Sequence, residues 1–264
     1  MTTFKYGGNV LPVDGFFKGG HYEGWRHTRI TKLVSLLGGE EWFKGKTVLE
    51  LACGFGHTSE LISEWGAIVT LTEGRKPHVV HAARHHAPVG RPVIVLNQEF
   101  PWNLAHVTDE THVRQPSNEV VVEPPTAARP FPDQSAKPNP VKFDLVIHWG
   151  ILYHLTNWQQ DLASALRHTN LLCLESEVGD SEDPTHDPKV REGWPGDSAL
   201  GEEGDSDGSR PSAAHVEKIL DDLGCTYTRY DDADLNFHYH KYDWKANNTG
   251  LAPAGQRRFW LVRK

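Results

Sequence analysis

The sequence predicts an α/β fold in which a mostly parallel β-sheet is covered by helices on both faces. Short apolar runs of strand length alternate along the chain with segments whose apolar residues recur at helical spacing. The apolar runs have no polar face, which is typical of strands buried on both sides of a parallel sheet. Alternation of this kind places the strands side by side and the helices over both faces. Such sheets bind ligands at the carboxyl ends of their strands, where the strand order reverses.

The first part of the chain supplies three strands and the helices between them. Residues 1–44 hold an N-terminal arm without clear periodicity and then a helix, because apolar residues recur at helical spacing over 21–38 and two glycines follow. The elements expected next are a strand at 46–51, a helix at 58–66, a strand at 67–72, a helix at 75–87 and a strand at 93–96.

A proline-rich stretch over 101–142 interrupts the pattern. A structureless segment of this length inside a domain is unusual, so we interpret it as an insertion or lid, with a short hairpin around 119–123. Residues 179–210 are acidic and rich in Gly and Ser, and are expected to form a long loop. The regular elements of this part are a strand at 143–148, a helix at 157–168, a strand at 171–175, a helix at 211–224 and strands at 226–230 and 258–262. We therefore expect a single domain over residues 1–264.

Composition narrows the functional classes. The 264 residues are 38% hydrophobic and 23% charged, which suits a soluble globular protein with a sizeable core. The formal net charge of -8 disfavours a broad nucleic-acid footprint. No apolar run is long enough to span a membrane, and the N-terminus lacks the features of a signal peptide. Cys53, Cys173 and Cys225 stand far apart, so we interpret them as reduced thiols of a cytoplasmic protein.

A glycine turn, ELACGFG (50–56), follows the first strand directly. Glycines let the backbone approach a ligand, and the start of the next helix adds positive potential. The turn lacks the GxGxxG spacing of dinucleotide-binding proteins, and the carboxylate of Glu50 would repel a pyrophosphate but would suit a cationic ammonium group. Glu73 ends the second strand, about twenty residues after Glu50, where a carboxylate can accept hydrogen bonds from both hydroxyls of a ribose.

The segment VLELACGFG (48–56) resembles motif I of the class I S-adenosylmethionine-dependent methyltransferases, which typically reads VLDLGCGTG. Ala52 stands where the family usually has glycine. The resemblance covers most of the chain from about residue 45, and it implies a Rossmann-like sheet of seven strands whose last strand is antiparallel. It also implies S-adenosyl-L-methionine as the cofactor and S-adenosyl-L-homocysteine as the product. The cofactor residues that it implies are Glu50, Ala52, Cys53, Gly54 and Gly56 at the methionine end, Glu73 at the ribose, and Gln98 or Glu99 at the adenine.

Residues 143–155, FDLVIHWGILYHL, resemble the fourth motif of one subset of that family, in which a sequence like MGVLYH follows the strand. Enzymes that modify the wobble uridine of tRNA carry it, as do several small-molecule and sugar methyltransferases, and the segment LESE (174–177) is similar to the same subset. A histidine with a pKa near neutrality can remove a proton from an attacking oxygen or nitrogen. His148 is therefore the first candidate for the general base and also for a cofactor contact, and His154 is the second. The alternative is that these histidines only pack at the strand end.

Further candidate residues either bind a ligand or only pack in the fold. Trp149 and Tyr153 are expected to contact the substrate, with strand-end packing as the alternative for Trp149. The helix at 21–38 would cover the cofactor and pair with its carboxylate, or it would merely pack on the sheet. The side chains of that helix that the two readings concern are Trp25, Arg26 and Arg29.

The C-terminal region holds a further set of polar candidates. His238, His240 and Asp243 could suggest a metal, but no supporting motif completes a ligand set. Alternation would place the two histidines on one face of a strand, where substrate contact or edge packing is favoured and no metal site is expected. The candidate anchors for an anionic substrate are Arg210, Arg257 and Arg258.

Taken together, these patterns predict an S-adenosylmethionine-dependent methyltransferase. The expected substrate is a polar small molecule, such as a sugar or a natural-product intermediate, methylated at an oxygen or nitrogen atom. Methylation of RNA, in particular tRNA, is the alternative that the wobble-uridine resemblance suggests. A third possibility is a non-catalytic cofactor-binding or interaction protein. The sequence predicts neither an oligomeric state nor the identity of the substrate.

Overall fold

The computed structural model describes residues 21–74, 76–91, 93–95, 141–155, 157–191, 207–251 and 255–264. The strands in these ranges are β1 (Thr47–Leu51), β2 (Ile68–Glu73), β3 (Val93–Val95), β4 (Leu145–Trp149), β5 (Leu171–Glu177), β6 (Lys189–Arg191), β7 (Asp207–Ser209), β8 (Thr226–Tyr230) and β9 (Arg257–Arg263). Seven of them form one sheet in the order β3-β2-β1-β4-β5-β9-β8, and β6 pairs with β7 in a separate two-stranded sheet.

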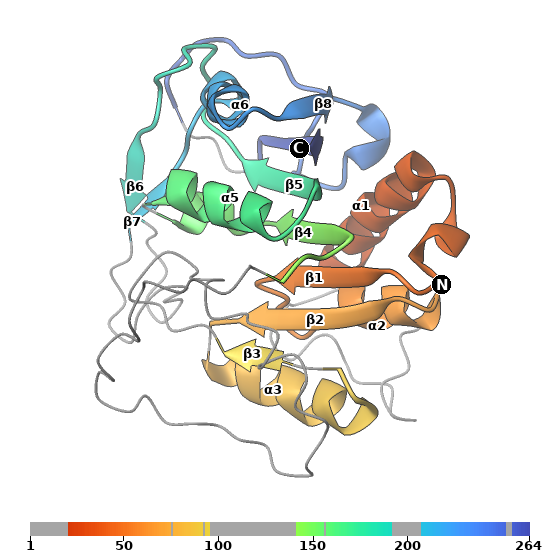
Figure 1. Cartoon of the computed structure of the whole chain (residues 1–264). Helices are drawn as coiled ribbons and strands as arrows, with labels where there is room; N and C mark the ends of the chain where they lie inside the picture. The colour runs from red at the N-terminus through yellow and green to blue at the C-terminus, as the bar shows by residue number, and fades with distance from the viewer. Residues whose placement is uncertain are drawn as a thin grey trace, which may run out of the picture.

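The topology creates a switch point between β1 and β4. Strands β1 to β3 extend toward one edge of the sheet, whereas β4 returns to the opposite side of β1. The pairs from β3 through β5 are parallel, and their arrowheads point the same way in Figure 1. Only β9 runs antiparallel, to both β5 and β8, so the last strand has the predicted direction. A ligand site is expected at the carboxyl ends of β1 and β4, because helices connecting to opposite faces leave a crevice there.

Helices cover both faces, as predicted. The helices are α1 (His21–Leu37), α2 (His57–Glu64), α3 (Lys76–His86), α5 (Trp158–Arg167) and α6 (Ala213–Asp222), with short 3-10 helices η2 (Glu40–Phe43), η3 (Ala87–Val89), η5 (Leu152–His154) and η6 (Ala233–Leu235). Alternate residues of β4 divide the core. Leu145 and Ile147 pack in a cluster with α1 and α2, and Val146 packs in a cluster with α5 and α6. Helices α5 and α6 lie on the viewer's side of the sheet in Figure 1. No helix of the described ranges is long and apolar enough to cross a membrane.

The predicted strands and helices of the main sheet all form, with ends that shift by at most two residues. The exception is the predicted loop over 179–210, because β6 and β7 pair there as a two-stranded antiparallel sheet. Strand β7 of this small sheet lies beside η5, near the carboxyl ends of the main strands (Figure 1). The hairpin predicted around 119–123, most of the 101–142 segment, and the predicted adenine contacts Gln98 and Glu99 lie outside the described residues.

Candidate active site

The glycine turn after β1 has the geometry of a ligand cradle. Gly54 adopts a φ of 60° and Gly56 a φ of 79°, in the left-handed region that favours glycine. A Cβ added to Gly54 would meet no atom of the described residues within 4 Å, so the turn is open on that side. Gly56 is the N-cap of α2, whose first turn therefore begins beside the opening. The sequence predicted this turn correctly because its signal is local.

Ala52 also takes a left-handed conformation, with a φ of 50°, at the position where the family usually has glycine. We therefore expect Ala52→Gly to stabilise the fold. A residue with a side chain loses about 1–2 kcal/mol of stability in the left-handed region, and glycine avoids this loss. Glycine also makes the unfolded chain more flexible, which reduces the gain in stability by about 0.4–1 kcal/mol. The net gain is roughly 0.5–1 kcal/mol, measurable as a higher urea midpoint at an unchanged slope. An unchanged or lower midpoint would show that the turn tolerates alanine without strain.

Two carboxylates hold this turn from β1 and β2. Glu73 ends β2, and its Oε2 accepts a hydrogen bond from Gly54 N at 2.7 Å while its Oε1 accepts one from Gly74 N at 2.8 Å. Glu50 is buried in β1, and its Oε2 accepts hydrogen bonds from the backbone N and the Oγ of Ser59 in α2, at 3.0 and 2.6 Å. Both predicted carboxylates therefore converge on the turn and the start of α2.

The electrostatics of this turn suit a ligand with a positive centre. Burial raises the pKa of Glu50, whereas its hydrogen bonds to Ser59 and Thr58 and the charge of Arg26 lower it. Burial, followed by the nearby charges of Glu50 and Glu73, raises the pKa of the Cys53 thiol well above its usual value. The thiol is therefore neutral, and among the described residues the charges nearest the turn include the two carboxylates and Arg26. Glycine with open space, two carboxylates and one cation together fit an amino-acid moiety and a ribose.

His148 lies in the core rather than in the opening, which corrects its predicted contact with cofactor and substrate. Its side chain is 0% exposed, on the face of β4 that α5 covers, and its Nε2 lies 2.6 Å from Oδ2 of Asp161 in that helix. A general base must reach the proton that it removes. The strand alternation that buries Val146 on this face buries His148 as well. His148 therefore joins β4 to α5 through its contact with Asp161.

Trp149 also packs inside the protein, on the opposite face of β4. It is 8% exposed, its Nε1 donates to Sγ of Cys173 at 3.2 Å, and the guanidinium of Arg29 lies 5.1 Å from its ring centroid. The predicted substrate contact is therefore replaced by a packing role between the sheet and α1.

Within the fourth motif, Tyr153 and His154 are the residues that lie at the carboxyl end of β4, where a site was expected. Both belong to η5, just beyond β4, and both are half-buried, with ring centroids 4.1 Å apart. The hydroxyl oxygen of Tyr153 accepts a hydrogen bond from Arg257 Nη2 at 3.3 Å, and burial raises the pKa of this phenol. The remaining candidate base is therefore His154, beside a neutral tyrosine at the carboxyl end of β4.

Five charged residues form an alternating chain across the carboxyl end of β5. Arg29 of α1 donates to Glu175 at 3.2 Å, and Glu175 accepts from Arg257 at 2.9 Å. Arg257 lies 3.6 Å from Glu177, which pairs with Arg210 at 2.8 Å. All five residues are nine-tenths or more buried. The chain ties α1, β5, β9 and the residue after β7 together, and the carbonyl of Tyr153 accepts a further hydrogen bond from Arg210 at 2.7 Å.

Helix α1 packs on this region, which is the alternative that sequence analysis left open for it, and the contact is largely made by Trp25. Its Nε1 donates to the hydroxyl of Tyr242 at 2.8 Å, and that hydroxyl donates to Oε1 of Glu175 at 3.0 Å. The guanidinium groups of Arg29 and Arg257 lie 3.8 and 4.3 Å from the Trp25 ring centroid. Trp25 is 4% exposed, so it packs α1 onto the sheet through this network.

The paired histidines of the C-terminal region are separated by a tight turn rather than aligned on a strand. Phe237 and His240 exchange two backbone hydrogen bonds, and between them His238 is exposed with a φ of 51°. His240 is 2% exposed, stacks on Trp25 at 4.0 Å and accepts a hydrogen bond from Arg257 Nε at 3.0 Å. The expected shared face is therefore wrong. Within the described ranges, no group of three or more candidate side chains is placed to hold a metal.

Arg258 lies apart from the charged chain, which corrects its predicted role beside Arg257. Neighbouring residues of a strand point to opposite faces, so Arg258 faces the side of the sheet that α6 covers. Its guanidinium donates to the carbonyls of Tyr242 and Trp244 at 2.6 and 2.8 Å and pairs with Asp231 at 3.2 Å. Burial lowers its pKa to about 10. These partners leave Arg258 little capacity for a substrate anion.

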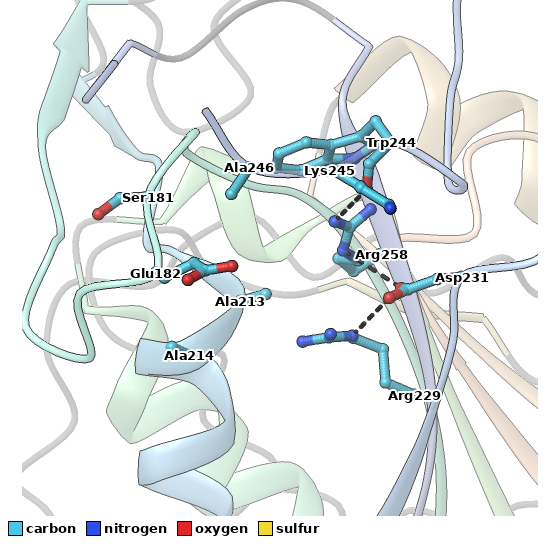
Figure 2. A pocket seen from close by; sticks show the side chains of 10 residues that line it. All are labelled: Ser181, Glu182, Ala213, Ala214, Arg229, Asp231, Trp244, Lys245, Ala246 and Arg258. Atoms are coloured by element: carbon cyan, nitrogen blue, oxygen red, sulfur yellow. Dashed lines mark hydrogen bonds and ion pairs between the residues drawn. The ribbon is translucent and has the colours of Figure 1, made fainter. Parts of the chain in front are cut away.

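A half-open cavity of about 460 Å³ adjoins Arg258, between the start of α6 and strands β8 and β9 (Figure 2). Most of the charged side chains that line it form ion pairs with other residues of the protein. Asp231 pairs with Arg229 at 3.0 Å and with Arg258 at 3.2 Å (Figure 2). Arg229 also pairs with Glu217 at 2.9 Å. The cavity lies on the opposite face of β9 from Glu175 and Arg257, so it is separate from the glycine turn and the charged chain.

Sequence analysis missed Glu175 and Tyr242 and left Arg257 outside the central set. The one signal was the segment LESE, in which two carboxylates end an otherwise apolar strand. Buried carboxylates require partners, but their partners come from residues 29, 210, 242 and 257, which are distant in sequence.

Comparison with known proteins shows the family to which the chain belongs. A family model described as a methyltransferase domain matches residues 22–230. No curated protein matches this chain significantly. Among solved structures, the N-terminal domain of EvdMO1, crystallised in the presence of SAH and D-fucose, is 15% identical with a TM-score of 0.54, and the alignment covers 93% of this chain and 84% of that one.

Two other solved structures share the fold. Magnesium protoporphyrin IX methyltransferase from Synechocystis PCC 6803, with bound SAM, is 13% identical with a TM-score of 0.51, covering 92% of this chain and 82% of that one. A chain from the complex between the Haloferax volcanii Trm112 methyltransferase activator and a putative methyltransferase is also 13% identical, with a TM-score of 0.53 and coverage of 95% and 94%.

Proposed function

We propose, from the premise that this chain belongs to the methyltransferase domain family, that it transfers the methyl group of S-adenosylmethionine to an oxygen or nitrogen atom of a polar small molecule. The observation that supports this most is the open turn at Gly54, flanked by Glu50 and Glu73 at the carboxyl ends of β1 and β2. The family supplies the reaction class, and the geometry supplies a site for the donor.

The residues of the turn fit S-adenosylmethionine in two parts. Glu73 would accept hydrogen bonds from the ribose hydroxyls, because a carboxylate can accept about four hydrogen bonds and the backbone amides of Gly54 and Gly74 take two of them. Glu50 and Arg26 would hold the charged amino-acid end, as their opposite charges match its ammonium and carboxylate groups. When bound, the cofactor supplies a methyl group that its sulfonium has already activated.

The protein's own contribution to the reaction is then mainly alignment and proton removal. An acceptor at the carboxyl ends of β4 and β5 would be held by η5 in line with the methyl group. His154 is the proposed general base, because it is partly exposed there and its ring lies 4.1 Å from that of Tyr153. The neutral phenol of Tyr153 would donate a hydrogen bond to the acceptor, since Arg257 can only donate to its oxygen.

A small acceptor is favoured over RNA by charge. The chain carries a net charge of -8, and the arginines nearest the proposed acceptor position are already paired with Glu175 and Glu177. Phosphate backbones are bound by clusters of unpaired cations. An RNA substrate would reveal itself by binding that falls steeply as salt is raised.

The experiment that tests the function is titration calorimetry of the purified protein with S-adenosylmethionine and S-adenosylhomocysteine. We expect saturable binding of both, followed by transfer of labelled methyl to a member of a panel of hydroxylated and amine-bearing small molecules. Labelling of tRNA alone, with binding that collapses at high salt, would support the RNA alternative. Absence of cofactor binding would contradict the proposal entirely.

Replacing the two histidines of the fourth motif should separate their roles. His154→Ala is expected to lower turnover by roughly 100-fold or more, within the usual contribution of a general base, and to leave cofactor affinity unchanged. His148→Asn is expected instead to lower thermal stability, because it breaks the buried contact with Asp161. If His154→Ala kept full turnover with the identified acceptor, alignment alone would account for catalysis.

A further inference from the structure

A buried histidine holds the glycine turn from beneath. His86 is the last residue of α3, is 0% exposed, and its Nε2 lies 3.1 Å from the carbonyl oxygen of Phe55. Phe55 stands between the two glycines of the turn. The contact joins residues 31 positions apart, so it fixes the turn relative to the helix that follows β2.

The partners of His86 determine which ring nitrogen carries the proton. Nδ1 lies 3.3 Å from Nη1 of Arg91, and a guanidinium can only donate. Nδ1 is therefore the acceptor, so Nε2 carries the hydrogen and donates it to the Phe55 carbonyl. Burial, as the largest cause, lowers the pKa of His86 to about 4, which keeps the ring neutral near pH 7.

The ring also fits closely against Gly56. A Cβ at Gly56 would overlap Nε2 of His86 and come within 2.6 Å of Cδ2 of Leu71. The amide of Gly56 donates to the carbonyl of Cys53 at 2.9 Å. The peptide unit between Phe55 and Gly56 is therefore bonded at both its carbonyl and its amide, and it cannot rotate without breaking a hydrogen bond.

We propose that His86 is a positioning residue for cofactor binding, acting through the Phe55 carbonyl on the shape of the glycine turn. The proposal rests on the proposed function, since the turn is the site assigned to S-adenosylmethionine. The hydrogen bonds of the Phe55–Gly56 peptide fix the conformation of the turn. In this conformation the Gly54 side of the turn remains open, and Gly54 N donates to Glu73. Arg91 contributes by fixing the tautomer of the ring.

The test compares three substitutions of His86 by titration calorimetry with S-adenosylhomocysteine. His86→Ala removes the donor and should weaken binding about tenfold, the equivalent of one lost hydrogen bond. His86→Gln carries an amide nitrogen at about the reach of Nε2 and should recover most of the affinity. His86→Asn is too short to reach the carbonyl and should behave like the alanine variant.

A matched control distinguishes positioning from general loss of stability. His168 is also buried, and its Nδ1 lies 2.9 Å from the carbonyl of Val141 at the opposite end of β4. His168→Ala should lower the unfolding temperature as His86→Ala does, yet leave the affinity for S-adenosylhomocysteine unchanged. Arg91→Met, which removes the donor to Nδ1 and leaves His86 in place, should weaken binding about threefold and serves as the readout if His86→Ala does not fold.

The outcomes are distinct for the two proposals. If the unaltered protein binds no S-adenosylhomocysteine, the proposed function fails. If it binds and the His86 and Arg91 variants bind equally well, His86 is only a core residue and the inference is overturned. Equal weakening by His86→Ala and His168→Ala would likewise overturn it, because loss of stability would then explain both.

Discussion

Glu73→Gln is expected to weaken the binding of S-adenosylmethionine by roughly 100-fold. The carboxylate of Glu73 accepts hydrogen bonds from the amides of Gly54 and Gly74 with its two oxygens. Glutamine keeps the shape but offers one oxygen, so its amide nitrogen would face a donor, either a backbone amide or a ribose hydroxyl, and the ribose would lose its charged acceptor. A hydrogen bond to a charged group contributes about 1.5–3 kcal/mol, and loss of about 3 kcal/mol in total corresponds to roughly two powers of ten in affinity.

The measurement is calorimetric titration of folded protein, with circular dichroism to confirm the fold. Glu64→Gln is the matched control, because it is the same chemical change at an exposed residue. Glu64 is the last residue of α2, at the end of the helix that lies farther from the turn. We expect its affinity to stay within about twofold of the unaltered protein. An effect of Glu73→Gln below about threefold would mean that the ribose is held elsewhere and that Glu73 only caps the turn.

The parts of the site that the sequence predicted are those whose signals are local. The turn at 50–56 combines a strand, two glycines and a helix start within a few positions, and Glu73 follows at the spacing of one β-α-β unit. In each case the position along the strand determines where the side chain lies, because the carboxyl ends of parallel strands meet at one edge. The fold itself followed from the alternation of buried runs and amphipathic segments.

The parts that could not be predicted depend on which face of a strand a residue occupies and on partners distant in the chain. His148 and Trp149 both end β4, but each points into a different half of the core. Arg257 and Arg258 are adjacent and equally basic, yet one joins the buried charged chain and the other packs toward α6. Helix α3 gave no sign that its last histidine would reach Phe55, because only the folded β2–α3 connection brings them together.

Glu175→Gln is expected to destabilise the fold by about 3–5 kcal/mol, because it removes one partner of a buried ion pair. Glu175 is 0% exposed and faces two guanidinium groups, those of Arg29 and Arg257. Glutamine matches its shape, so the loss reports the charge and not a cavity. Domains are commonly stable by about 5–15 kcal/mol, so this change should remove a large share of the total. Urea unfolding followed by tryptophan fluorescence measures it.

Asp222→Asn provides the contrast that tests whether burial is the cause. The Lys218–Asp222 pair is closer, at 2.6 Å, than either contact of Glu175, but its two side chains are 49% and 57% exposed. Water screens an exposed pair, and such i,i+4 pairs contribute about 0.3–0.5 kcal/mol. We therefore expect the shorter ion pair to have the smaller effect, by roughly tenfold in energy. Similar losses in the two variants would mean that Arg29 and Arg257 are solvated or re-paired with Glu177 when Glu175 loses its charge.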